Sequence, residues 1–195
     1  MDDKKKLVIV IAALAVLLVV SVAVYDNYKD RVDPATGTVV TGDSQAMGEA
    51  SAAVNTLSPA PDFTMQDASG KSVKLSDFKG KPVVLNIWTS WCSYCKAEMP
   101  YFESAYKQYG DKVQFVMLNP VKSERSADGG KNFIKSSGYT FPVFYETGGK
   151  VLSQYGLRGF PSTIFIDAQG NLVSKNVGAI TQAKLNAGIQ SLLGS

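Results

Sequence analysis

Two apolar segments of strand length, with a helical pattern between them, place the strongest constraint on how this chain can fold. Residues 82–88 and 113–118 are nearly continuous apolar runs, which is typical of strands buried on both faces of an α/β sheet. An apolar stripe at spacings of three and four residues lies between them: Cys95, Met99, Phe102 and Tyr106. This strand–helix–strand order requires a right-handed crossover and parallel pairing. The sequence therefore predicts an α/β domain.

Shorter patterns on both sides of this unit predict the remaining elements. Strand-like segments flank the Gly-containing turns at 68–71 and 168–171, so each turn predicts a β-hairpin. Three more elements are expected: a helix over 131–136, a strand over 141–145, and a last helix that Thr181 caps. Pro100 falls inside the first helix and is expected to kink it, because proline lacks a backbone donor.

The N-terminus differs in composition from this domain. Residues 7–25 form a 19-residue apolar run without charge or proline, and a helix of that length spans roughly 28 Å, close to the thickness of a bilayer core. The three lysines at 4–6 place residues 1–6 in the cytoplasm. We therefore expect a transmembrane signal-anchor. The alternative is a cleaved signal peptide with its cleavage site at 21–23, but signal cores are shorter, at about 7–15 residues.

Residues 26–59 are small and polar, which predicts a flexible extracytoplasmic tether to the domain over 60–195. From residue 60 onward, 15 Lys and Arg stand singly among 10 Asp and Glu, and this scatter argues against a nucleic-acid surface. Either interpretation of the N-terminus exports the domain. With the anchor, we expect a single-pass, monomeric protein of the cell membrane with its catalytic domain on the extracytoplasmic side.

The complete absence of histidine excludes several classes of site. Neither Ser–His–Asp nor Cys–His catalysis is possible, and neither are zinc sites of the Cys2His2 kind or histidine-ligated haem and copper. We expect no metal and no cofactor.

The chemistry is predicted to reside in the only two cysteines, Cys92 and Cys95. A disulfide between them closes too small a loop to stabilise the fold much by restricting the unfolded chain. Their place where the first long strand gives way to a helix is more informative, because the helix N-terminus favours a thiolate at Cys92. We expect Cys92 to attack a substrate disulfide and Cys95 to resolve the mixed disulfide.

Three other interpretations of the cysteine pair are weaker. A zinc site would need a second pair of ligands. Haem attachment would need histidine where Lys96 stands. A peroxidatic cysteine would want threonine and proline at three and seven residues before Cys92; Thr89 fits, but Leu85 does not.

Several segments form one recognisable set: 60–63, 75–81, 86–95 with Cys92 and Cys95, Pro100, 159–163, and an extra helix–strand segment over about 120–145. In these segments the chain resembles thioredoxin, and more closely the membrane-anchored TlpA/ResA-like branch of the thioredoxin-like superfamily. The resemblance covers residues 60–195. It implies a thioredoxin fold with an N-terminal hairpin and a central helix–strand insertion.

The resemblance also implies roles for residues near the dithiol. Pro161 corresponds to the family's cis-proline, which packs against the dithiol and presents the substrate backbone; a trans turn proline is the alternative. Trp91 would flank the dithiol, and Phe160 would join it in contacting substrate. Ser93 and Tyr94, between the cysteines, would adjust the reduction potential. Tyr94 stands where thioredoxin has proline and strong oxidases have histidine, so we expect a potential nearer the reducing end.

A proton-handling residue is expected as well. Asn86 occupies the place of thioredoxin's buried aspartate, so that relay is missing. Glu98, three residues after Cys95, matches a glutamate of the TlpA/ResA-like branch and lies on the same helix surface. We expect it to exchange a proton with Cys95; an exposed, merely solubilising glutamate is the alternative.

Together these features predict an extracytoplasmic thiol–disulfide oxidoreductase that reduces exported proteins. Possible substrates include apocytochrome c and methionine sulfoxide reductases, and a membrane electron donor would re-reduce the pair. The tether would raise the effective concentration near membrane partners. A thiol oxidase or isomerase acting on secreted proteins, and a non-enzymatic binding domain on a thioredoxin scaffold, remain as alternatives.

Overall fold

The computed structural model of the chain describes Leu18 and residues 58–194. Apart from Leu18, the expected anchor at 7–25 lies outside the described residues, as do residues 1–6 and almost all of the tether at 26–59. Within the part that is described, no helix combines the length and the apolar character that crossing a bilayer requires.

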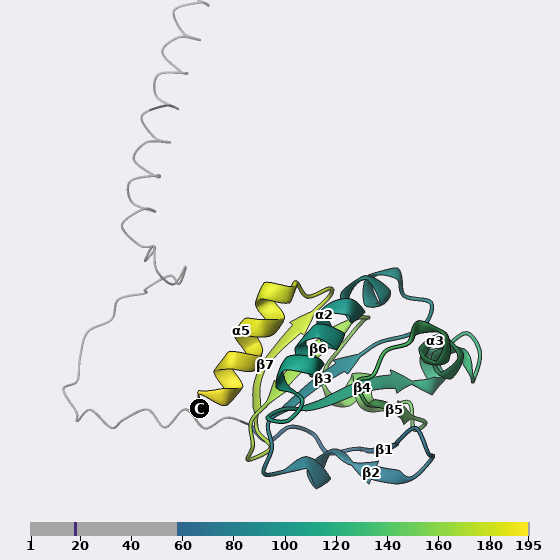
Figure 1. Cartoon of the computed structure of the whole chain (residues 1–195), viewed down its shortest axis with the longest axis horizontal. Coiled ribbons are helices and arrows are strands. Elements are labelled where there is room, and N and C mark those ends of the chain that lie inside the picture. Colours follow the sequence, from purple (N-terminus) through teal and green to yellow (C-terminus); the bar gives the residue numbers. More distant parts are fainter. Residues whose placement is uncertain (1–17, 19–57, 195) are drawn as a thin grey trace, which may run out of the picture. The chain divides into compact units, whose positions relative to one another are not determined.

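A single mixed sheet of seven strands organises the described domain (Figure 1). The strands are β1 (Thr64–Gln66), β2 (Ser72–Lys74), β3 (Val83–Ile87), β4 (Gln114–Pro120), β5 (Val143–Glu146), β6 (Ser162–Ile166) and β7 (Leu172–Val177). Their order across the sheet is β2-β1-β5-β4-β3-β6-β7. β4 pairs in parallel with both β3 and β5, whereas β6 runs antiparallel to β3 and β7. The predicted parallel crossover is therefore confirmed.

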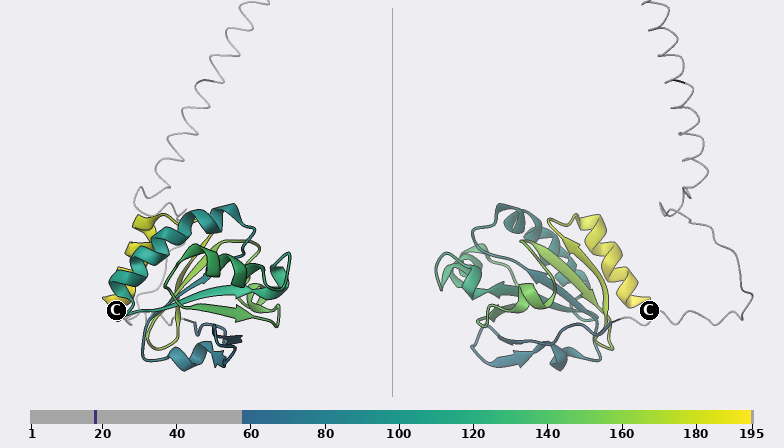
Figure 2. Two further views of the ribbon diagram at one scale, coloured as in Figure 1. Left: turned by 45° about the vertical axis from the view of Figure 1, so that its right-hand side comes forward. Right: turned by 180° about the vertical axis from the view of Figure 1, so that it is seen from behind.

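Helices cover both faces of this sheet. They are α2 (Ser93–Tyr109), α3 (Gly129–Ser137), α4 (Val151–Gln154) and α5 (Gln182–Leu193), with 3-10 helices η1 (Leu75–Phe78) and η2 (Val121–Ser123). α2 and α5 lie side by side on one face (Figures 1 and 2). η1 and α4 contribute to the core on the opposite face.

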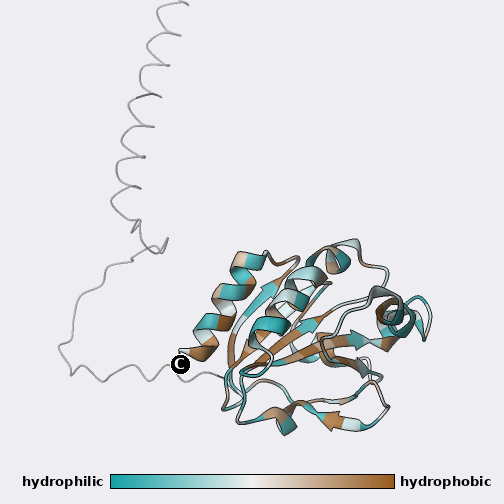
Figure 3. Ribbon diagram, in the orientation of Figure 1, coloured by the Kyte–Doolittle hydropathy of each residue, from teal (hydrophilic) through white to brown (hydrophobic). Residues whose placement is uncertain are grey.

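The core consists of two layers because successive side chains of a strand point to opposite faces. On β3, Val84 packs toward α2 and α5, whereas Leu85 and Ile87 pack into the opposite layer. All three are buried, which explains why β3 reads as a continuous apolar run. The apolar central strands are visible in Figure 3. Each such side chain contributes about 1.5–3 kcal/mol by its burial.

Most predicted elements are confirmed with shifted ends. Both hairpins form, the helix expected over 131–136 begins at Gly129, and the Thr181 hydroxyl caps α5 by accepting from the Lys184 N–H. α2 continues through Pro100, and the kink expected there stays a prediction. The short helix α4 was not predicted, because four residues are too few to show a helical period.

Candidate active site

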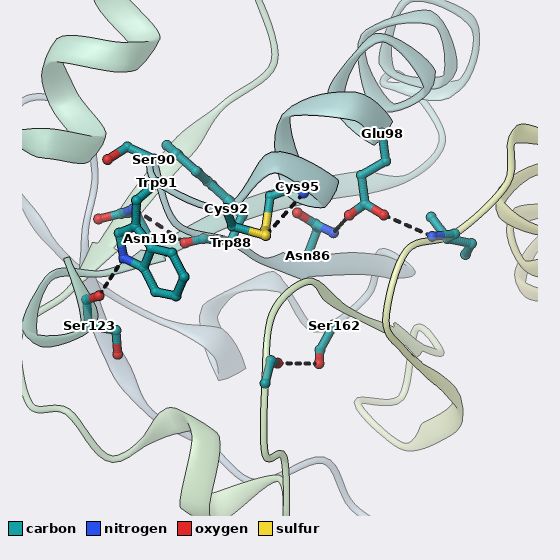
Figure 4. The surroundings of a disulfide bond; sticks show 12 residues. Asn86, Trp88, Ser90, Trp91, Cys92, Cys95, Glu98, Asn119, Ser123 and Ser162 are labelled. Carbon is teal, nitrogen blue, oxygen red and sulfur yellow. Dashed lines mark hydrogen bonds between the residues drawn. A yellow bond between two sulfur atoms is a disulfide. The ribbon is translucent and has the colours of Figure 1, made fainter. Parts of the chain in front are cut away.

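Cys92 and Cys95 form a disulfide at the start of α2, with their Cα atoms 5.3 Å apart. Cys92 is the N-cap residue of the helix, and its Sγ accepts a hydrogen bond from the Cys95 N–H at 3.2 Å (Figure 4). The predicted placement at a helix N-terminus is therefore confirmed, and it favours negative charge on Cys92. Cys92 is 7% exposed and Cys95 is 0% exposed, so Cys92 is the more accessible of the two cysteines.

Glu98 lies one helical turn after Cys95 and is buried, with only 2% of its surface exposed. The interpretation of Glu98 as an exposed, solubilising residue is therefore wrong. Its Oε1 accepts from Asn86 Nδ2 and its Oε2 from the Ile180 N–H, both at 2.8 Å (Figure 4). Burial raises the pKa of Glu98 to about 7, and the hydrogen bonds from Ile180 and Asn86 oppose this rise. The carboxyl group can thus gain or lose a proton near neutral pH.

Asn86, which occupies the place of thioredoxin's buried aspartate, has a role of its own because it holds Glu98 by a hydrogen bond. It is buried on β3, and its Nδ2 also donates to Thr163 Oγ1 at 3.2 Å. Its own Oδ1 is buried and has no hydrogen-bond partner among the described residues. Asn86 therefore holds Glu98 from the sheet side while Ile180 holds it from the loop before α5.

The residues expected to contact substrate come from two loops: Phe160 and Pro161 precede β6, and Trp91 precedes Cys92. The Phe160–Pro161 peptide bond is cis, as predicted, and Pro161 is buried. The Trp91 side chain is exposed and its ring packs edge-on against Phe160, with ring centroids 6.0 Å apart. Trp91 and Phe160 thus form an aromatic pair, and Trp91 directly precedes Cys92. Their role in binding substrate stays a prediction.

Ser93 and Tyr94, the residues between the cysteines, are exposed in the first turn of α2. Tyr94 and Tyr101 border a hollow of about 210 Å³ whose lining includes Glu98 and Ile180. A cavity of about 260 Å³ lies elsewhere, and none of the predicted site residues lines it.

Further polar contacts at the site were not predicted from the sequence. They join residues 88–91, directly before Cys92, to residues 119–124, at the end of β4 and directly after it. Hydrogen-bond partners about 30 positions apart leave no recognisable pattern in the sequence, so only the folded structure reveals these contacts. No cluster of three or more potential metal ligands occurs within the described part of the chain.

The more exposed cysteine lies at a helix N-terminus, and the second cysteine, a buried carboxyl group and a cis-proline lie in the same region. These features define a redox-active dithiol protein of thioredoxin fold. The Redoxin family matches residues 56–189. The chain belongs to this family, within its ResA-like members, and it is a thiol–disulfide oxidoreductase.

Similar proteins support this assignment. The chain is 39% identical over 130 residues to the thiol-disulfide oxidoreductase ResA of Bacillus subtilis (strain 168), which covers 66% of this chain and 71% of that protein. It is 36% identical over 134 residues to a ResA of Bacillus cereus, covering 68% of this chain and 76% of that protein.

Solved structures agree on the fold. The exposed lipoprotein thioredoxin Etrx1 of Streptococcus pneumoniae strain TIGR4 superposes with a TM-score of 0.61 at 35% identity, over 69% of this chain and all of that one. StoA of Bacillus subtilis gives 0.59 at 29% identity, over 67% and 97%. The predicted thioredoxin fold is confirmed.

Proposed function

We propose that this chain is an extracytoplasmic reductase of exported proteins, held at the cell membrane by residues 7–25. The proposed direction of electron flow depends on the effect of Glu98 on the thiols. When it is ionised, the buried Glu98 carboxylate one turn from Cys95 disfavours a second negative charge on the Cys95 thiol. A reduced form whose thiolates are disfavoured gives up electrons more readily, which makes the dithiol a better reductant. Ser93 and Tyr94 carry no positive charge that would offset this effect.

The proposed cycle moves two electrons from the dithiol to the substrate. The Cys92 thiolate attacks one sulfur of a substrate disulfide, forms a mixed disulfide and releases the other substrate sulfur as a thiolate. Ionised Glu98 then takes the proton of the Cys95 thiol, and the Cys95 thiolate attacks Cys92 Sγ. The Cys92–Cys95 disulfide forms, and the second substrate thiolate leaves and takes up a proton from solvent. A membrane electron donor completes the cycle by reducing the pair.

The proposed location rests on the N-terminal sequence, and the proposed substrates rest on the similarity to ResA proteins. The apolar run with lysines before it supports an anchor, and the following polar residues would let the domain reach membrane partners at raised effective concentration. Exported proteins with oxidised cysteines, such as apocytochrome c or methionine sulfoxide reductases, are the proposed substrates.

The reduction potential of the full-length chain tests the direction. Equilibration with dithiothreitol buffers should give a value near the reducing end of the family range, about −270 mV as in thioredoxin. A value near about −120 mV, as in strong oxidases, would contradict the reductase and favour the oxidase alternative.

Trapping identifies the substrate. Replacing Cys95 with alanine removes the resolving thiol, so Cys95→Ala should accumulate a mixed disulfide between Cys92 and its natural partner. Mass spectrometry of the trapped species names the partner, with a Cys92→Ala, Cys95→Ala double variant as the control that forms no adduct. Failure to trap any exported protein would contradict the proposed substrate class.

A further inference from the structure

Glu124 connects the segment after β4 to the loop that leads into Cys92. Its Oε1 accepts from the Ser90 N–H at 2.7 Å, and its Oε2 accepts from Ser90 Oγ at 2.6 Å. Asn119 Nδ2 also donates to Oε1, at 2.6 Å. Hydrogen bonds to an ionised acceptor are roughly twice as strong as neutral ones. One carboxylate therefore holds the residue two positions before the attacking cysteine at both its main chain and its side chain.

Two neighbouring contacts hold the same loop. Asn119 Nδ2 donates to the Trp88 carbonyl oxygen at 3.3 Å, and Trp91 Nε1 donates to the Ser123 carbonyl oxygen at 2.9 Å (Figure 4). The Arg125 guanidinium lies 5.5 Å from the centre of the Trp91 ring. Loop 88–91 is thus held at Trp88, Ser90 and Trp91, immediately before Cys92.

The paired glycines at the start of α3 show how closely this region is packed. A Cβ atom on Gly129 would lie 3.0 Å from both Glu124 Oε2 and Ser90 Oγ. A Cβ atom on Gly130 would lie 2.6 Å from the side chain of Asn119. A Cβ atom at either position would force a neighbouring side chain to shift, so the glycines let α3 pack closely against Glu124 and Asn119.

We propose that Glu124 is a positioning residue of the oxidoreductase, which sets Cys92 and the Trp91 indole for attack on a substrate disulfide. Glu124 acts on the reacting sulfurs through Ser90. The orientation of a nucleophile matters because misplacement by about 1 Å can cost 10²-fold in rate. The role holds for either direction of electron flow, so it stands independently of the proposed reductase function.

The test measures single-turnover attack by the reduced full-length chain on oxidised glutathione, at a pH above the Cys92 thiol midpoint. Glu124→Ala should attack about 10-fold more slowly. Glu124→Gln should fall between this variant and the natural chain, because its carbonyl oxygen can still accept from the Ser90 N–H. Asp128→Asn is the matched control: it removes an exposed carboxylate from the same segment and should leave the rate unchanged.

A second measurement separates positioning from general stability. Trp88 is fully buried, so acrylamide-quenchable fluorescence reports on Trp91 and should rise in Glu124→Ala and not in Asp128→Asn. Equal rates in Glu124→Ala and Asp128→Asn would overturn the proposal. So would a rate loss that matches only the unfolded fraction in urea titrations, or one explained entirely by a shifted thiol midpoint. If Glu124→Ala does not fold, the same criteria apply to Glu124→Gln.

Discussion

At the scale of single residues, Glu98 depends on its burial between β3 and the loop before α5. Burial favours the neutral acid, whereas the N–H groups of Ile180 and Asn86 favour the carboxylate. The pKa of about 7 is the balance of these effects. The side chain is held in place because its two hydrogen-bond partners belong to the central sheet and to the residue before the α5 cap.

The raised pKa predicts how stability changes with pH. The pKa of Glu98 is about 7 in the folded chain and 4.5 ordinarily, so the folded state binds the proton more tightly. This stabilisation is fully present below pH 4.5 and is lost as the pH rises through 7. The shift corresponds to about 3 kcal/mol in the free energy of unfolding. Glu98→Gln should remove this decline, as urea titrations of the oxidised chain between about pH 4 and 8 would show.

Oxidised protein is used because its cysteines do not titrate, so the difference between the two chains isolates Glu98. Equal pH dependence of unfolding in both would contradict the raised pKa. In the reduced chain, Glu98→Gln should also change the pH dependence of disulfide reduction and the thiol pKa values. If neither changed, the proposed proton transfer would be wrong.

At the scale of elements, the contact between α5 and the sheet depends on one glycine. A Cβ atom on Gly188 would lie 2.3 Å from the ring of Phe165 on β6. Leu185, Ile189 and Leu192 are buried on the same helix. α5 therefore sits close to the sheet because Gly188 has no side chain.

Gly188→Ala should accordingly destabilise the fold by about 1–3 kcal/mol, the usual effect of overpacking a core. Alanine has a higher helix propensity than glycine, so a loss of stability in Gly188→Ala could be attributed to the steric clash with Phe165. Gly194→Ala at the end of the same helix is the control, since its Cβ would make only an ordinary contact at 3.5 Å. Urea unfolding measures both variants, and equal midpoints would contradict the close packing of α5.

At the scale of the whole molecule, the fold brings together active-site residues that lie far apart in the sequence. The dithiol begins α2, the cis-proline precedes β6, and the contact to Glu98 comes from Ile180, 82 residues further along the chain. The strand order places β3 between β4 and β6, so the loops at these strand ends meet around Cys92. The active site therefore depends on the central strands β3, β4 and β6 and the loop before α5, and not on the Cys-x-x-Cys segment alone.

The full chain should behave as a single-pass membrane protein when expressed in bacteria. Residues 7–25 are long and apolar enough to span the bilayer, so the protein should sediment with membranes, resist extraction by alkaline carbonate, and be digested by protease added outside spheroplasts. A shortened protein in the soluble fraction would show that the segment is a cleaved signal peptide and would contradict the anchor. Placing two arginines within 7–25 is the control that should abolish export.

Much of the fold could be predicted because its signals are local. The apolar run of β3, the helical stripe of α2 and the Thr181 cap each reflect a period or a hydrogen bond within a few residues. Element ends were less predictable: β4 extends to Pro120, beyond the apolar run, because the pairing with β5 continues there. The cysteines, Pro161 and Glu98 were found through a motif and a family resemblance.

The α/β class, the reactive pair and its place at a helix N-terminus could be inferred from the chain alone, since strand periodicity, spacing and capping act between neighbours. The folded structure was needed to show that Glu98 is buried with a raised pKa, that Asn86 holds it, and that Glu124 holds Ser90 across 34 residues. The physical reason is that desolvation and long-range hydrogen bonds depend on which segments meet. That meeting is set by strand order and packing, which no local pattern encodes.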